Sequence, residues 1–210
     1  MASKKPKVGV SACLTGDKVR YDGGDKHQPL ITTLLSEQLE LLPFCPEMAA
    51  GLGVPRPPVQ LVASDGGLQA LGVEQKELDV TSALQNACNQ YIAAKSKLHG
   101  FILKSRSPSC GLGSTPLHND NRIAIDTSSG LFAATIRSHY PNIPIVEESW
   151  LDTDWRGRLF ITCCQISSNK QAKAGLKFAM GKTNDQELFS TLLSLPQQSA
   201  EKIIMRFNGC

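Results

Sequence analysis

The stretch KVGVSAC, residues 7–13, decides the fold. Val8 and Val10 alternate with small residues, which predicts a short buried strand. Ser11, Ala12 and Cys13 then predict a loop at the carboxyl end of that strand. Open α/β sheets carry their functional residues in such loops. We therefore expect Cys13 to lie at the edge of a sheet.

Two other segments repeat this arrangement of strand, loop and cysteine. LPFCPE, residues 42–47, indicates the end of a strand followed by a loop with Cys45. GFILK, residues 100–104, predicts a buried strand that leads directly into SRSPSCG and Cys110. The order of the chain therefore predicts that three cysteines gather at one edge of a parallel sheet.

The remaining segments favour helices between these strands, since apolar residues recur at near-helical spacing. Alternation of strands and helices favours an α/β fold with a largely parallel sheet flanked by helices, which is a Rossmann-like arrangement. We predict a domain over 1–160 and a small helical extension over 161–210. The predicted helices cover 30–41, 74–98, 130–141, 170–180, 186–195 and 199–207, with a β-hairpin over 61–73 and a strand over 142–148.

Composition excludes several classes of protein. The net charge of +3 and the low aromatic content make nucleic-acid binding unlikely. No apolar run approaches the length of a membrane span, and the amino terminus lacks the apolar core of a signal peptide. We therefore expect a cytoplasmic protein without a membrane partner. Whether it is a monomer or a homodimer stays open.

The settings of Cys13, Cys45 and Cys110 are typical of ligand thiolates. Each has polar neighbours and a glycine or proline within three residues, which suits a loop rather than a core. Three thiolates can hold an iron–sulfur cluster and leave one iron without a protein ligand. Such an iron is a Lewis acid. Zinc held by three thiolates, or Cys110 acting as a lone nucleophile, are alternatives.

The other four of the seven cysteines show weaker signals. Cys88 lies on the apolar face of a predicted helix, which indicates the core. Cys163 and Cys164 follow an apolar, strand-like stretch, and we expect one to be buried and the other exposed. Cys210 ends the chain and is expected to fray.

Polar side chains accompany each of the three cysteines. Glu47 stands two residues after Cys45 and can carry a proton beside a bound ligand, although it can equally cap the helix that follows. In the Cys110 segment, hydroxyls and free backbone N–H groups surround one sulfur, which also suits a phosphate-binding loop. The side chains that we predict to contact substrate are Asp22, Lys26, Ser105, Arg106 and Ser109.

Together these segments resemble the DUF523 (YbbK-like) family, which includes the thiouracil desulfidases. The resemblance rests on VGVSACLTGDKVRYDGGDK (8–26), FCPEMAAGLGVPRPPVQL (44–61) and GFILKSRSPSCGLGS (100–114), with a weaker match over GLFAATIRSHYPNIPIVEE (130–148). It covers about residues 5–160. The helices beyond residue 160 fall outside it and receive no role.

The resemblance implies a [4Fe-4S] cluster with three cysteine ligands, Cys13, Cys45 and Cys110. It also implies that the open iron binds the sulfur of a thiolated nucleobase such as 2-thiouracil, which is converted to uracil and sulfide without net redox. Glu47 and Ser107 match catalytic positions of the family. The substrate is then a small-molecule nucleobase.

Two other functions suit the same cysteines. The open iron can deliver sulfide to a tRNA base, or the protein can be a non-enzymatic carrier of a cluster or of sulfide. Sulfur insertion requires a basic RNA-binding surface, which a net charge of +3 supports weakly. A carrier has no need of Glu47 or of the hydroxyl-rich loop at 105–109.

Overall fold

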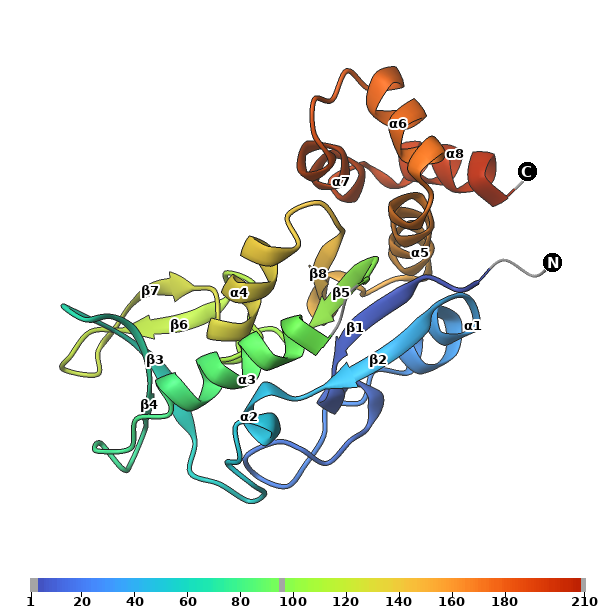
Figure 1. Ribbon diagram of the computed structural model, residues 1–210. Coiled ribbons are helices and arrows are strands. Elements are labelled where there is room, and N and C mark those ends of the chain that lie inside the picture. The colour runs from blue at the N-terminus through green and yellow to red at the C-terminus, as the bar shows by residue number, and fades with distance from the viewer. Residues whose placement is uncertain (1–3, 95–96, 209–210) are drawn as a thin grey trace.

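The structure is a computed structural model, and it describes residues 4–94 and 97–208. Two four-stranded sheets lie side by side, and a group of helices follows them in the chain (Figure 1). Among the described residues, no helix is both long and apolar enough to span a membrane.

The first sheet is entirely parallel, as the sequence predicts. Its strand order is β2-β1-β5-β8, so the strands that precede Cys45, Cys13 and Cys110 are neighbours. Because parallel strands share one carboxyl edge, the loops that follow them are brought together. The strands are β1 (Lys7–Ser11), β2 (Glu40–Phe44), β5 (Gly100–Leu103) and β8 (Ile145–Glu147).

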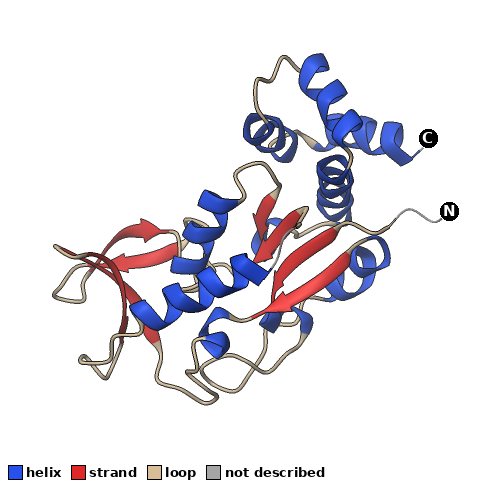
Figure 2. Cartoon of the chain, viewed as in Figure 1, coloured by secondary structure: helices blue, strands red, loops and turns tan. Residues whose placement is uncertain are grey.

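Helices cover both faces of this sheet (Figure 2). Phe101 of β5 packs with residues of α3 (Thr81–Ala94) and α4 (Leu131–His139), whereas the next residue, Ile102, packs with residues of α5 (Asp154–Ser168). A Cβ atom on Gly9 would lie only 2.3 Å from the Phe101 ring, so only glycine fits at this position of β1.

The second sheet has the order β4-β3-β6-β7 and is mostly antiparallel. The predicted hairpin is confirmed as β3 (Val59–Ser64) and β4 (Gly67–Gly72). The strands β6 (Thr115–His118) and β7 (Ala124–Ser128) were not predicted. Both are short and β7 is mostly exposed, so neither has a clear apolar alternation.

Two predicted helices have different bounds from those expected. The segment 30–41 forms a π-helical turn (Ile31–Leu35) and a short α1 (Ser36–Gln38), after which β2 begins at Glu40. Its leucines satisfy a helical spacing, but pairing with β1 determines the structure. In the segment 74–98, the helix begins only at Thr81, whose backbone N–H donates to the Asp79 carboxylate; residues 95–96 lie outside the described part.

The carboxyl-terminal helices share a core of their own. The apolar residues of that core come from α5 and from α7 and α8, and α6 packs beside them. Helix α5 also contributes to the core beneath the parallel sheet, so the boundary predicted at 160/161 falls inside it. The three later helices are α6 (Lys170–Ala179), α7 (Asp185–Leu193) and α8 (Gln197–Asn208).

The prediction for the adjacent cysteines is wrong. Cys163 and Cys164 lie on α5, not after a strand, and both are fully buried. Cys163 faces the core of the carboxyl-terminal helices and Cys164 faces the core beneath the sheet. A helix packed on two sides buries consecutive residues, which the sequence of α5 alone does not reveal. Cys88 is buried as predicted, and Cys210 lies outside the described residues.

Candidate active site

A cavity of about 530 Å³ lies at the carboxyl ends of β1, β2 and β5. Cys13, Cys45 and Cys110 all line it, as the order of the chain predicts. Although Cys13 and Cys110 lie far apart in the sequence, the adjacent parallel strands place both in the same site. The elements of the fold therefore assemble a site that holds three thiols.

Short helical turns position the first two cysteines. Cys13 lies in a 3-10 turn (Ala12–Thr15) that ends at Gly16, where a φ of 99° requires the left-handed conformation that glycine tolerates. Cys45 precedes α2 (Pro46–Ala49), and Pro46 suits the first position of that helix. Each sulfur is thereby fixed just beyond its strand.

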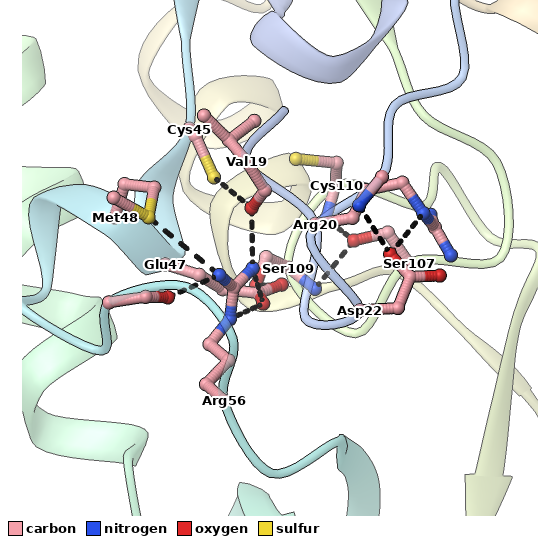
Figure 3. Close-up of polar contacts among 12 residues, drawn as sticks. Val19, Arg20, Asp22, Cys45, Glu47, Met48, Arg56, Ser107, Ser109 and Cys110 are labelled. Atoms are coloured by element: carbon pink, nitrogen blue, oxygen red, sulfur yellow. Dashed lines mark hydrogen bonds and ion pairs between the residues drawn. The ribbon is translucent and has the colours of Figure 1, made fainter. Parts of the chain in front are cut away.

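The loop that carries Cys110 is held by its own hydroxyl groups. The Ser107 Oγ accepts hydrogen bonds from the backbone N–H groups of Ser109, at 3.3 Å, and of Cys110, at 3.1 Å (Figure 3). Arg106 adopts a φ of 59°, which is unusual for a residue other than glycine. Ser107 therefore shapes the loop around the third cysteine.

Two consecutive glutamates at the end of β8 and just after it anchor the same loop on both sides. Glu148 accepts hydrogen bonds from the Ser105 N–H at 2.6 Å and from the Lys104 ammonium at 2.5 Å. Glu147 accepts from the Leu112 N–H at 2.6 Å and from the Ser114 hydroxyl. These carboxylates tie the residues before and after Cys110 to the sheet.

Burial raises the pKa of all three thiols. The pKa of Cys13 rises to about 11, first because of burial and then because of the nearby Cys45, although Arg20 and Lys104 oppose the rise. The pKa of Cys110 lies well above its ordinary value for the same first reason, with Ser11 acting against it. The pKa of Cys45 is also raised by burial, while the Met48 N–H opposes this.

This set of thiols fits an iron–sulfur cluster. The three thiols line one cavity, and positive iron would favour the deprotonated form that binds it. Among the described residues, no three His, Cys, Asp or Glu side chains are grouped so as to hold a single metal ion. A [4Fe-4S] cluster binds each cysteine through a different iron, so its ligands need not converge on one point.

Glu47 lines the cavity and is held by a buried ion pair. Its Oε2 accepts hydrogen bonds from Arg56 Nε at 2.9 Å and Nη2 at 2.6 Å, and its Oε1 accepts from the Ser109 hydroxyl at 2.8 Å (Figure 3). The Arg56 side chain is only 5% exposed. The carboxylate is therefore fixed in orientation beside Cys45 and Cys110.

The structure brings most of the predicted substrate-contacting residues to this cavity. Lys26, Ser105 and Arg106 line it, together with Ser107. Asp22 does not line it: its side chain is exposed and accepts from the Gly24 N–H at 3.0 Å, which lowers its pKa. Ser109 is fully buried behind the cavity and donates to Glu47.

Several residues of the site were not singled out from the sequence. Arg56 stands in a segment of prolines that reads as a loop, and nothing local indicates that it pairs with Glu47. Glu148 belongs to the weaker segment of the resemblance, IVEE, where two consecutive carboxylates at a strand end are an available signal. Long-range partners of this kind become visible only once the strands are placed.

The protein thus has an α/β fold with a cavity at the edge of its parallel sheet, and three cysteines in that cavity fit the ligands of an iron–sulfur cluster. The model of the 2-thiouracil desulfurase family matches residues 8–148. The chain belongs to this family.

Two known proteins are similar to the chain. The uncharacterized protein YbbK of Bacillus subtilis (strain 168) is 31% identical over 111 residues, which is 50% of this chain and 72% of that protein. A solved structure, the [4Fe-4S]-dependent thiouracil desulfidase TudS (DUF523Vcz), is 32% identical with a TM-score of 0.55, and covers 70% of this chain and 93% of its own. These matches confirm the resemblance and the fold class.

Proposed function

We propose that this protein removes sulfur from a thiolated pyrimidine such as 2-thiouracil and releases uracil and hydrogen sulfide. The observation that carries the proposal is the convergence of Cys13, Cys45 and Cys110 in one cavity within the family region. The [4Fe-4S] dependence of the similar desulfidase TudS supports a cluster at these cysteines.

A cluster held by three cysteines supplies, when bound, an iron that acts as a Lewis acid toward a thiocarbonyl sulfur. The overall change is hydrolysis: one water is consumed, the C=S group becomes C=O, and hydrogen sulfide leaves. No electrons are gained or lost. The reaction therefore needs a group that moves protons and a cavity that orients the ring.

Glu47 is the proton-transfer group in this proposal. Its carboxylate lines the cavity and keeps one lone pair, on Oε1, beyond those used by Arg56 and Ser109. It accepts a proton as water attacks the thiocarbonyl carbon and returns a proton to the departing sulfur. Arg56 holds the Glu47 carboxylate in position before the substrate binds, and such preorganisation lowers the barrier to reaction.

The loop before Cys110 orients the ring. Ser107 lines the cavity, and its oxygen is occupied by two backbone N–H groups, so its O–H is directed to another acceptor. That acceptor is a ring carbonyl or nitrogen in this proposal. Lys26, Ser105 and Arg106 supply further polar contacts from the cavity wall.

Anaerobic reconstitution with iron and sulfide tests the proposal, followed by addition of 2-thiouracil and measurement of uracil and sulfide. We expect about four irons per chain in the wild type and release of both products in equal amounts. Cys110→Ala should lose both. Glu47→Gln should retain iron and lose activity by about 10²-fold or more, the usual contribution of a general acid or base.

Other outcomes separate the alternatives. Iron uptake without release of uracil would favour sulfur insertion or carriage, and binding of bulk tRNA in a gel shift would then select between these two. A Glu47→Gln variant that equals the wild type in every property would favour a carrier. A wild type that takes up no iron would overturn the proposal.

A further inference from the structure

The cations that line the cavity fall into two groups. Arg56 and Lys104 are fully engaged by the protein. Arg56 donates from two nitrogens to Glu47, to the Val19 carbonyl at 2.9 Å, to the Gly53 carbonyl at 2.8 Å and to the Met48 Sδ at 3.7 Å. The Lys104 ammonium donates to Glu148 and to both oxygens of Ser105. Neither has a donor left for a ligand, so both hold the walls of the cavity.

Arg20 is the opposite case. Its side chain is only 21% exposed, and it lines the cavity. Within residues 4–94 and 97–208, its Nε is buried without a hydrogen-bond acceptor. Asp22 approaches that Nε only to 3.6 Å, and the Tyr21 ring lies 5.4 Å from the guanidinium carbon.

The buried Nε of Arg20 is costly, because this donor has lost water without a replacement acceptor. Arg56 shows that this fold satisfies a buried arginine elsewhere in the same site. The remaining free cations of the wall, Lys26 and Arg106, are exposed and retain water as a partner. Arg20 is therefore the cavity cation that gains most from a ligand.

Arg20 also lies close to the thiols. It lines the same cavity as Cys13, Cys45 and Cys110. A pyrimidine whose sulfur is directed toward the cysteines therefore brings its other ring substituents within reach of the nearby cavity wall. In 2-thiouracil the other exocyclic acceptor is the oxo group at C4, which desulfuration leaves in place.

We propose that Arg20 binds substrate by donating from its terminal nitrogens to this C4 oxo group, and so selects pyrimidines that carry it. The inference rests on the proposed function, since that function supplies the ring. Asp22 holds the guanidinium from outside the cavity without satisfying it, which gives this predicted site residue a positioning role.

Binding of two ligands without sulfur tests the inference apart from catalysis. Uracil has the C4 oxo group and pyrimidin-2-one lacks it. Calorimetric titration of the reconstituted protein should show uracil bound about 10- to 100-fold more tightly than pyrimidin-2-one, as expected for a hydrogen bond from a charged donor. Arg20→Gln should remove that preference and leave the affinity for pyrimidin-2-one within about twofold.

Two further variants serve as comparisons. Arg20→Lys keeps the charge and should retain part of the preference, whereas Arg158→Gln, at an exposed position of α5, should behave as the wild type. Thermal unfolding of each variant establishes that it is folded. If Arg20→Gln weakened both ligands equally, or neither, the inference would be wrong.

A wild type that binds both ligands equally, or neither, also overturns it. The result is separate from the proposed function: a protein that prefers uracil through Arg20 but does not release sulfide refutes the desulfidase and keeps the inference. A protein that desulfurates 2-thiouracil, and whose Arg20→Gln variant still prefers uracil over pyrimidin-2-one, supports the desulfidase and refutes the inference.

Discussion

The sheet-edge cavity and the carboxyl-terminal helical core both contain cysteines, in very different surroundings. Cys13, Cys45 and Cys110 lie in loops beside Arg20, Lys104 and hydroxyl groups. In the helical core, Cys163 is surrounded by leucine, isoleucine and phenylalanine side chains. Burial raises the pKa of the thiols in both sets. The cavity also provides charges and hydrogen-bond donors that can support a bound ligand.

This comparison shows that burial alone does not separate a ligand cysteine from a structural one. Cys110 is 5% exposed and Cys163 is fully covered, which is a small difference. What separates them is the neighbouring polar groups: the Ser11 hydroxyl opposes the rise in the pKa of Cys110, whereas burial raises the pKa of Cys163 without such opposition among the described residues.

The largest expected effect is on iron binding. Cys13→Ser or Cys45→Ser should reduce reconstituted iron from about four per chain to below about one, and desulfuration should become undetectable. Removing one of only three protein ligands leaves the cluster too weakly held. Iron analysis and the visible absorption of the cluster give the measurement. A variant that keeps full iron content would show that its cysteine is no ligand.

The buried ion pair behind Cys110 should dominate the stability of the cavity. Glu148→Ala leaves the Lys104 ammonium, whose side chain is 17% exposed, without its carboxylate. Breaking a buried pair on one side costs about 3–5 kcal/mol of unfolding free energy. Urea unfolding of the apoprotein gives the measurement.

A matched surface pair provides the control for that prediction. Arg156 and Asp152 lie 2.9 Å apart, with side chains 32% and 54% exposed. Asp152→Asn should cost no more than about 1 kcal/mol, because solvent screens an exposed pair. Equal costs for the two variants would contradict the anchoring role of Glu148.

Removing a cysteine from the helical core should affect stability and leave iron binding intact. Cys163→Ala deletes one buried sulfur and should reduce the unfolding free energy by about 1 kcal/mol, the cost of a small cavity. Iron content and desulfuration should match the wild type. Loss of iron in this variant would mean that the two sets of cysteines are not functionally distinct.

The sequence was sufficient to predict the parallel sheet and the meeting of the three cysteines. Each of these depends on a local pattern, an apolar strand followed by a small-residue loop, together with the rule that parallel strands share a carboxyl edge. Cys13, Cys45 and Cys110 therefore needed no long-range information. Glu47 was singled out from its place beside Cys45, and the family resemblance added Ser107; both line the cavity.

The partners of these residues could not be predicted in the same way. The Glu47–Arg56 and Lys104–Glu148 pairs depend on how loops fold back, which no periodic pattern records. Asp22 and Ser109 were expected to contact substrate, but one lies outside the cavity wall and the other behind it. The short strands β6 and β7 were missed because pairing with neighbours, rather than their own pattern, stabilises them.

The smallest expected effect concerns pH and the junction between α6 and α7. Asp185 lies 2.6 Å from Lys173 and 2.8 Å from Lys177. Burial alone would raise its pKa, but the two lysines outweigh burial and lower it. Because the folded pKa is then below the unfolded value of about 3.9, the stabilisation is complete above that pH and is lost as the pH falls through the folded pKa.

Hydrogen exchange of α6 and α7 between pH 5 and pH 3 measures this effect, after correction for the intrinsic pH dependence of exchange. The wild type should lose protection in these helices as acid is added, by less than about 1 kcal/mol, since the pairs are partly exposed. Asp185→Asn should start lower and change less over the same range. Asp185 lies outside the cavity, so the hydrogen-exchange protection of the cavity residues should be the same in the two proteins. Equal acid sensitivity of both proteins at α6 and α7 would show that the lysine pairs do not stabilise the junction. A change that extended to the loop of Cys110 would mean that the helical core and the sheet-edge cavity are coupled through α5.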